Sequence, residues 1–343
     1  MMHLKRITLP AGFAALAISQ AAARPAAPVP VARNGEKPRN VIFILSDDHR
    51  YDFMGFTRAV PWLQTPALDR MAREGACLKN AFVTTSLSSP SRASILTGLF
   101  THTHTVVDNQ APKPDDLVFF PQYLQQNGYR TAFFGKWHMG NQDDMPQPGF
   151  DHWEGFRGQG TYYNTVLNIN GERVKFDPEL YSTDILTDHA IDFVRDNEEG
   201  PFFIYLSYKS VHSGFQPSPS RKGMYKDEKA VYPPSFNVPE YGIPRLPSKD
   251  ADGRPLAGRG WYGESRLPDW VKNQRESWHG VDYQYHGALP YEEDFRNYCE
   301  TVTSMDDAIG RLLDFLQAEG LGESTLVIYI CLLYTSPSPR DRG

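Results

Sequence analysis

A run of five consecutive apolar residues near the N-terminus limits the possible fold most strongly. Residues 41–45 read Val-Ile-Phe-Ile-Leu, without the alternating polar residues of a strand that has one face in water. Such a run is typical of a strand covered on both faces, as in the parallel sheets of α/β proteins. Similar apolar, β-branched or aromatic runs predict further strands at 81–83, 131–134, 202–206 and 325–330.

Helical patterns lie between these strands. Apolar residues at helical spacing, or a proline near the start of a segment, predict helices at 66–74, 91–99, 184–197 and 294–319. Strands that alternate with helices indicate an α/β fold with a mainly parallel central sheet.

Composition excludes several classes of protein. The 343 residues are 40% hydrophobic and 22% charged, which is too apolar for a disordered chain. Lysine and arginine total 35 against 41 acidic residues, a net charge of −6, and this balance gives no sign of a nucleic-acid partner. The three cysteines are an odd number in a long chain, so a small disulfide scaffold is also excluded.

The N-terminus is typical of an export signal. Lys5 and Arg6 precede an apolar stretch at 9–18 and three alanines at 21–23, so we predict a signal peptide over 1–23. The apolar stretch falls short of the ~20 residues that span a bilayer, so we expect no stable membrane insertion. The predicted location is periplasmic or extracellular. Residues 24–36 are expected to form a disordered lead-in.

The remaining chain divides into a native part and a suspected tail. Residues 331–343 are rich in serine, proline and arginine and resemble translated library-adapter sequence, so we predict that they are non-native. We expect one catalytic domain over 37–330. Within it, the segment 213–290 is rich in proline and aromatic residues, which favours an ordered insertion that wraps the surface.

Polar residues follow several of the predicted strands, at the edge where α/β sheets bind ligands. Ser-Asp-Asp-His at 46–49 comes directly after the first strand, and its two carboxylates offer oxygen ligands to calcium or magnesium. The alternative for this pair is a helix N-cap or a solvated turn. Three more polar segments follow later strands, at 84–98, 135–140 and 208–212.

These segments resemble the sulfatase family. Residues 88–98 match the signature C/S-x-P-S-R-x-x-x-L-T-G at every defined position, and 135–138 match the family's G-K-W-H block. His212 is similar to the family's histidine near the leaving-group oxygen. Residues 106–109 resemble N-acetylglucosamine-6-sulfatase-like members, and arylsulfatase-like bacterial members are also similar. The resemblance implies an alkaline-phosphatase-like α/β sandwich, with a central mainly parallel sheet flanked by helices.

The resemblance also implies a modified nucleophile and a metal. In the serine-type branch, Ser88 would be converted to formylglycine (3-oxoalanine) by a formylglycine-generating maturation enzyme. The hydrated aldehyde has two hydroxyls on one carbon: one attacks sulfur, and deprotonation of the other then expels sulfate. The implied cofactor is calcium, bound by Asp47, Asp48 and the modified Ser88.

Four further residues receive roles by the same resemblance. Arg92 would steady the hydrated aldehyde, and Lys136 would pair with sulfate oxygens. His138 would bind sulfate or transfer a proton, and His212, as a protonated imidazole, would donate a proton to the departing alcohol.

Two other polar clusters carry weaker signals. His102 and His104 follow the signature segment and are candidates for substrate contact, although two histidines alone are poor evidence for a metal. Asp306 and Asp307 lie within the last predicted helix, where a polar face or a structural hydrogen bond is the expected role.

One part of the family pattern is missing. In sulfatases the strand that matches 325–330 runs into S-D-N-G, whose Asp and Asn bind the metal. Here Cys331 takes that place and no Asp-Asn pair follows. Half of the implied metal shell and the C-terminal subdomain are therefore absent, and we predict that the chain as written is truncated and inactive.

The predicted activity is hydrolysis of the sulfate ester of a sulfated carbohydrate. Two alternatives stay open. One is a phosphate or phosphonate ester hydrolase of the same superfamily. The other is a non-catalytic sulfoglycan-binding protein in which Ser88 is unmodified.

Overall fold

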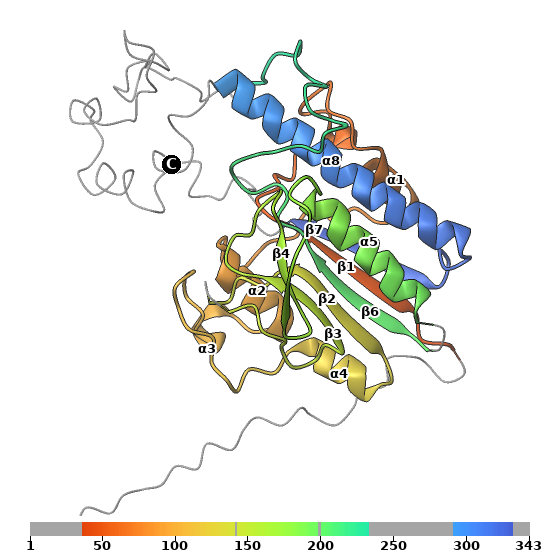
Figure 1. Ribbon diagram of the computed structural model, residues 1–343. Helices are drawn as coiled ribbons and strands as arrows, with labels where there is room; N and C mark the ends of the chain where they lie inside the picture. Colours follow the sequence, from red (N-terminus) through yellow and green to blue (C-terminus); the bar gives the residue numbers. More distant parts are fainter. Residues whose placement is uncertain (1–35, 141–142, 198–199, 233–290, 332–343) are drawn as a thin grey trace, which may run out of the picture.

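A single seven-stranded sheet organises the chain in the computed structural model, which describes residues 36–140, 143–197, 200–232 and 291–331. The strand order is β5-β4-β3-β2-β6-β1-β7 (Figure 1). The strands are β1 (Asn40–Ser46), β2 (Arg130–Lys136), β3 (His152–Phe156), β4 (Val166–Ile169), β5 (Glu172–Lys175), β6 (Phe202–Ser207) and β7 (Thr325–Cys331).

The sheet is mainly parallel. Strands β3, β2, β6, β1 and β7 run in the same direction, whereas β4 and β5 form an antiparallel hairpin at one edge. At the centre, Ser207 at the end of β6 is in register with Leu45 of β1 and with Gly135 of β2. The carboxyl ends of these three strands therefore meet, and the residues that follow them share one edge of the sheet.

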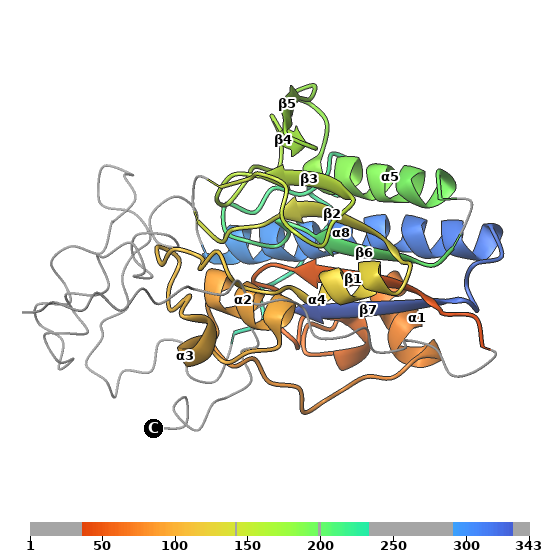
Figure 2. The same cartoon turned by 90° about the horizontal axis from the view of Figure 1, so that it is seen from below.

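Helices cover both faces of the sheet (Figures 1 and 2). α5 and α8 pack against each other on one face, and α1 packs on α8. α2 and α4 lie on the opposite face. The helices are α1 (Pro66–Glu74), α2 (Ser88–Thr97), α3 (Thr101–His104), α4 (Phe120–Gln126), α5 (Ser182–Arg195) and α8 (Tyr291–Ala318), with a 3-10 turn η1 (Gly55–Thr57).

β1 contributes to the cores on both faces. Ile42 and Ile44 pack with α5 and α8, whereas Leu45 packs with α2 and α4, as do the half-buried Val41 and Phe43. Successive side chains of a strand point to opposite faces, so a strand covered on both sides needs apolar residues throughout. The expectation of a doubly covered strand at 41–45 is confirmed.

The α/β fold with a mainly parallel sheet is confirmed, and the structure corrects one strand. The helix predicted at 66–74 has the same bounds as α1, and those at 184–197 and 294–319 correspond to α5 and α8. The strand predicted at 81–83 is wrong: this described segment is irregular and leaves Phe82 73% exposed. Three apolar or small residues without a neighbouring strand bury too little surface to form one.

Several predictions fall on residues outside the described part. These are the signal peptide, all but the last residue of the lead-in, most of the insertion (233–290) and the tail beyond Cys331, and they stay predictions. Residues 213–232 are described and pack on α8, where Glu300 accepts hydrogen bonds from the backbone of Gly223 (2.9 Å) and Tyr225 (3.1 Å). Among the described helices, none is long and apolar enough to cross a membrane.

The structural role expected for Asp306 is confirmed. Its carboxylate, on α8, accepts hydrogen bonds from the backbone N–H groups of Ala67 (2.9 Å) and Leu68 (2.8 Å) in the first turn of α1. The first N–H groups of a helix lack partners within the helix, so this buried carboxylate supplies them from the neighbouring element.

Replacing Asp306 by alanine is expected to lower the free energy of unfolding by about 1–3 kcal/mol, because two buried N–H groups lose their acceptor. Urea denaturation followed by circular dichroism measures the loss. The matched control is Asp307→Ala, which removes a half-exposed ion pair with Arg221 (2.7 Å) and should cost less than about 1 kcal/mol. Equal losses in the two variants would contradict the capping role.

Candidate active site

Two carboxylates follow β1 directly and lie at the carboxyl edge of the sheet. The backbone of Asp47 is fixed on both sides: its N–H donates to the Ser210 carbonyl (2.8 Å), and its own carbonyl accepts from the Val211 N–H (2.6 Å). Asp48 adopts a left-handed backbone conformation with φ of 56°. Such conformations cost free energy in residues other than glycine and are concentrated at functional sites.

Asp47 is a buried carboxylate held by two buried cations. Lys136 Nζ donates a hydrogen bond to Asp47 Oδ2, and Arg92 Nη2 lies 3.7 Å from Oδ1. Burial alone would raise the pKa of Asp47, but the charges of Lys136 and then Arg92 outweigh burial and hold that pKa well below its usual range. Asp47 is therefore ionised.

Asp48 faces His212, which follows β6. The distance from His212 Nε2 to Asp48 Oδ2 is 3.5 Å. Burial, and then repulsion by Asp47, raises the pKa of Asp48 to about 7. Burial, and then repulsion by Lys136, lowers the pKa of His212 to about 3, so its ring is neutral at pH 7. A protonated imidazole, as expected from the sequence, would need the added negative charge of a bound anion.

The two aspartates fit part of a calcium site. Asp47 Oδ1 and Asp48 Oδ1 are buried and accept no hydrogen bond from the residues that the structure describes. Buried polar atoms without a partner call for an explanation, and carboxylate oxygens are the ligands that calcium prefers. In the part of the chain that the structure describes, no group of three or more His, Cys, Asp or Glu side chains is placed to hold a metal. Asp47 and Asp48 would therefore supply only part of the coordination shell of a calcium ion.

Ser88 is the first residue of α2. The sequence predicted a helix from residue 91, but the extended Leu87 is the last residue before the helix, so the predicted nucleophile lies in the first turn. This turn lies at the positive end of the helix dipole. The next residue anchors the turn: the Ser89 N–H donates to Asn109 Oδ1 (3.0 Å), and its hydroxyl donates to the His138 carbonyl.

Arg92 connects α2 to the ends of two strands. Its Nη1 donates to the Lys136 carbonyl (2.7 Å) and to Ser207 Oγ (2.6 Å), while its Nε and Nη2 have no hydrogen-bond acceptor among the described residues. The guanidinium is almost fully buried. Arg92 therefore fixes the geometry of the site and keeps N–H donors available for an anion.

The G-K-W-H block has a packing reason for its glycine. A Cβ atom on Gly135, which has φ of +107°, would lie 1.9 Å from the Ser207 carbonyl oxygen, so β2 and β6 approach closely only with glycine there. The following Lys136 points to Asp47 and also donates to Gln159 Oε1. His138, with φ of 48°, lies 3.5 Å from the Gln159 amide through its Nε2.

Gln159 was not predicted from the sequence. It follows β3 in the short segment Arg-Gly-Gln-Gly (157–160), where a lone glutamine between glycines carries no recognisable pattern. Its contacts with Lys136 and His138 place it in the site. The structure thus joins the predicted residues into two groups: Asp47 with Arg92 and Lys136, and Asp48 with His212.

The histidines after α2 differ in their roles. His104 is buried: its Nδ1 accepts from the Val106 N–H (3.1 Å), and its Nε2 lies 3.0 Å from Ser94 Oγ. These bonds occupy both ring nitrogens, so His104 is structural and not a substrate ligand. His102 is exposed, and its ring is stacked on Phe100 with 5.9 Å between the centroids.

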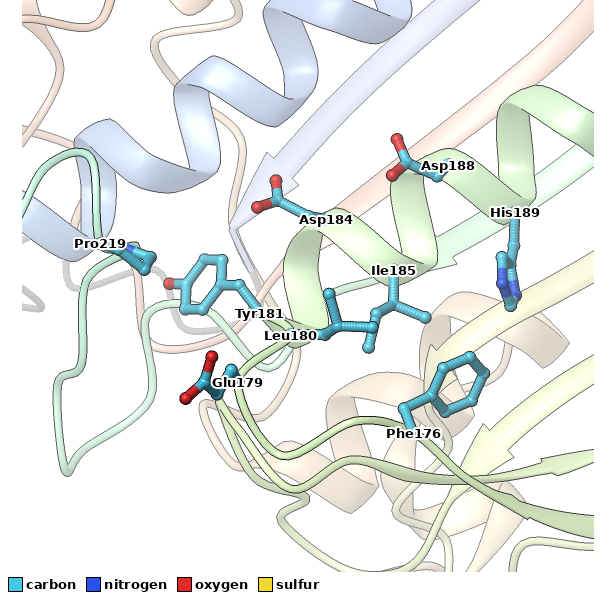
Figure 3. Close-up of a pocket in the computed structure, with 9 residues that line it drawn as sticks. All are labelled: Phe176, Glu179, Leu180, Tyr181, Asp184, Ile185, Asp188, His189 and Pro219. Atoms are coloured by element: carbon cyan, nitrogen blue, oxygen red, sulfur yellow. The ribbon is translucent and has the colours of Figure 1, made fainter.

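A separate cavity of about 340 Å³ lies beside α5 (Figure 3). None of the predicted site residues lines it. Its wall includes the acidic side chains of Glu179, Asp184 and Asp188, together with Phe176 and His189. Carboxylates repel an anion such as sulfate, so this cavity does not suit the predicted substrate.

His189 belongs to a partly buried cluster next to this cavity, around the buried carboxylate of Glu154. Glu154 accepts from His189 Nδ1 (2.6 Å) and lies 2.8 Å from His152 Nε2. The hydrogen bond to Glu154 raises the pKa of His189 despite the opposing effect of burial. A raised pKa contributes stability that is present below the unfolded value of 6.5 and is lost as the pH rises through the folded value.

We expect His189→Gln to lower the melting temperature more at about pH 5.5 than at about pH 8.5, because only the protonated ring forms the ion pair. Differential scanning fluorimetry at the two pH values measures the difference. His102→Gln, which changes an exposed ring, should show no such dependence. A His189→Gln loss that is the same at both pH values would disprove the pairing.

Fold and site together define an α/β protein whose candidate active site lies at the carboxyl edge of a mainly parallel sheet. The profile of the sulfatase family matches residues 39–331, so the chain belongs to the sulfatase family. The resemblance seen in the sequence is confirmed. The alkaline-phosphatase-like fold is confirmed by solved sulfatase structures that cover 86–88% of the chain.

Relatives show which sulfatases the chain is similar to. It is 31% identical over 330 residues to the N-acetylglucosamine-6-O-sulfatase of Bacteroides thetaiotaomicron, covering 85% of this chain and 57% of that protein. The N-acetylglucosamine-6-sulfatase of Capra hircus is 26% identical, covering 87% of this chain and 51% of the relative. The chain thus spans little more than half the length of these relatives.

A solved structure gives a similar result. A protein in complex with its substrate, D-glucosamine-2-N,6-O-disulfate, superposes with a TM-score of 0.65 and 28% identity, covering 86% of this chain and 65% of that one. The phosphonate monoester hydrolase of Agrobacterium radiobacter shares the fold, with a TM-score of 0.56 and 17% identity.

Proposed function

We propose that the sulfatase to which this chain belongs hydrolyses the sulfate ester of a sulfated carbohydrate. The observation that carries this proposal is the buried group of Asp47, Lys136 and Arg92 at the sheet edge. The two cations concentrate positive charge where an anionic ester would bind. The relatives named for N-acetylglucosamine 6-sulfate support a sugar as the alcohol.

Ser88 is the proposed position of formylglycine, which would require a maturation enzyme in the host. Its hydrate would supply the nucleophilic hydroxyl. The first turn of α2 supports this role, because the positive end of the helix dipole favours negative charge beside residue 88. Asp47 Oδ1 and Asp48 Oδ1 are the proposed calcium ligands from this part of the chain, and calcium would add positive charge against the sulfate oxygens.

The remaining residues would hold the anion and move protons. Arg92 offers its Nε and Nη2 donors, which have no hydrogen-bond acceptor among the described residues, to negative charge on the reacting group, and Lys136 offers its ammonium. His212 is neutral before substrate binds. The negative charge of a sulfate would raise its pKa, so that the ring can take a proton and deliver it to the departing alcohol. His138 would bind the sulfate alongside it.

Export is proposed from residues 1–23 alone. Relatives in Caenorhabditis elegans and Drosophila melanogaster bear names that describe extracellular sulfatases, which supports an exported location.

Peptide mass and sulfate release test the proposal together. In protein from the native host, the tryptic peptide 80–92 should have lost two hydrogens, and N-acetylglucosamine 6-sulfate should release sulfate measurable by ion chromatography. An unshifted mass would exclude the formylglycine mechanism. Hydrolysis of a phosphonate monoester in preference to the sulfate would favour the phosphonate alternative. Binding of the sulfated sugar without release would favour the binding alternative.

A further inference from the structure

Lys209 follows the strand in the middle of the candidate site, although no sequence pattern assigned it a role. It follows β6, the strand between β2 and β1, by two residues. Because Ser207 is in register with both Leu45 and Gly135, the residues after β6 emerge between the segments that carry Asp47 and Lys136.

The ammonium of Lys209 is buried without a carboxylate. The residue is 6% exposed, and in the described ranges no acidic side chain lies within ion-pairing distance of its Nζ. Its contact is the face of the Tyr162 ring, with 4.9 Å from Nζ to the centroid. A cation–π contact offsets only part of the free energy of burying a charge, and Asp47 and Asp48 attract this ammonium from beyond ion-pairing distance.

The position of Lys209 is fixed by the turn that carries His212. The His212 N–H donates to the Lys209 carbonyl (2.9 Å), and the Tyr162 hydroxyl donates to the His212 carbonyl (2.7 Å). The Tyr162 ring is stacked on Tyr181, with 6.0 Å between centroids and an 8° angle between planes. One rigid unit thus positions both the ammonium and the imidazole at the site.

Among the described residues, the site holds more cations than fully ionised carboxylates. Arg92, Lys136 and Lys209 are positively charged, whereas Asp47 is ionised and the pKa of Asp48 is raised to about 7. Burial, and then repulsion by Lys136, lowers the pKa of Lys209 to about 8, which still leaves it mostly charged at pH 7.

We propose that Lys209 binds an oxyanion of the substrate in the candidate active site. The inference rests on the proposed function and adds a residue that recognises the sulfated sugar. The oxyanion is either the ester sulfate or a second acidic group on the same sugar. Both offer acceptor oxygens to an ammonium that has no ion pair with a carboxylate in the described part of the chain.

Calorimetric titration of the full chain with inorganic sulfate, glucosamine 6-sulfate and glucosamine 2-N,6-O-disulfate tests the proposal. Lys209→Met should weaken binding by about 10-fold or more, the scale of one lost charge-assisted bond, whereas Lys209→Arg should stay within about 3-fold of wild type. Lys175→Met, on the exposed strand β5, is the matched control and should leave all affinities unchanged.

The three ligands distinguish the two sources of the oxyanion. Weaker binding of all three to Lys209→Met assigns the ammonium to the ester sulfate, and weaker binding of the disulfate alone assigns it to a second acidic group. Because the lost charge had no carboxylate partner, Lys209→Met should melt at the wild-type temperature or above, which a purely structural lysine would not do.

Two results would overturn the inference: equal affinities of wild type and Lys209→Met for all three ligands, or no binding of any of them to wild type. Failure of the proposed function looks different. It would appear as binding that depends on Lys209 without release of sulfate from the sugar.

Discussion

Lys136→Met is expected to destabilise the protein by about 3–5 kcal/mol, the largest loss of stability that we predict for a single substitution. The reason is the isolation of Asp47, which is fully buried and would lose the ammonium that donates to its Oδ2. The charge of Arg92, at 3.7 Å from Oδ1, is too weakly placed to replace it. Urea denaturation in the presence of EDTA measures the loss without a metal that could take the place of the lysine.

A second substitution separates the charge effect from lost packing. Adding Asp47→Asn to Lys136→Met should recover a large part of the stability, because a neutral amide replaces the stranded carboxylate, and the coupling between the two sites should reach about 1–3 kcal/mol. Lys226→Met, an exposed lysine in the segment after β6, provides the control for removing a positive charge. A loss below about 1 kcal/mol in Lys136→Met would show that the buried pair does not form.

Ser88→Ala should abolish sulfate release, with a fall of at least about 10³-fold in kcat in protein matured in its host. Loss of a covalent nucleophile has effects of this order, and the rest of the site cannot supply one. Binding of sulfate should change far less, because Arg92, Lys136 and Lys209 are untouched. Sulfate release by ion chromatography and binding by calorimetry measure the two effects separately.

Thr97→Ala is the matched control for Ser88→Ala. It removes a hydroxyl from the last residue of the same helix, where Thr97 Oγ1 donates to the Ala93 carbonyl (2.6 Å). This variant should keep sulfate release within about 3-fold of wild type. Retained activity in Ser88→Ala would show that another residue carries the nucleophile.

The sequence predicted the strands whose residues are apolar and missed the others. β1, β2 and β6 are apolar runs inside the sheet, as burial on two faces requires. β7 was also predicted from its apolar run, although it lies at one edge of the described sheet and is only partly buried. β5, with the sequence Glu-Arg-Val-Lys, is exposed throughout and forms only because β4 pairs with it. β3 contains Glu154, whose burial depends on two histidines, one of them 35 residues later in the chain.

The residues of the site were predictable where a motif marks them and not elsewhere. Ser88, Arg92 and Lys136 belong to dense motifs, and the structure brings Arg92 and Lys136 to Asp47. The predicted start of α2, at residue 91, lies three residues after the observed start at Ser88. The difference arises because proline is accepted in the first turn of a helix as well as before it. Gln159 and Lys209 have roles that follow only from which strands are neighbours in the sheet, and spacing along the chain does not reveal that.

The position of β1 in the sheet has a consequence for how the protein is made. β1 leaves the ribosome early, but its two neighbours are β6 and β7, and Asn40 is in register with Thr325, 285 residues later. Contacts between such distant segments form slowly, and an unpaired apolar strand is prone to aggregate until they form. The newly made chain must therefore keep residues 41–45 without a strand partner until β6 has been made, and one edge of β1 stays unpaired until β7 follows.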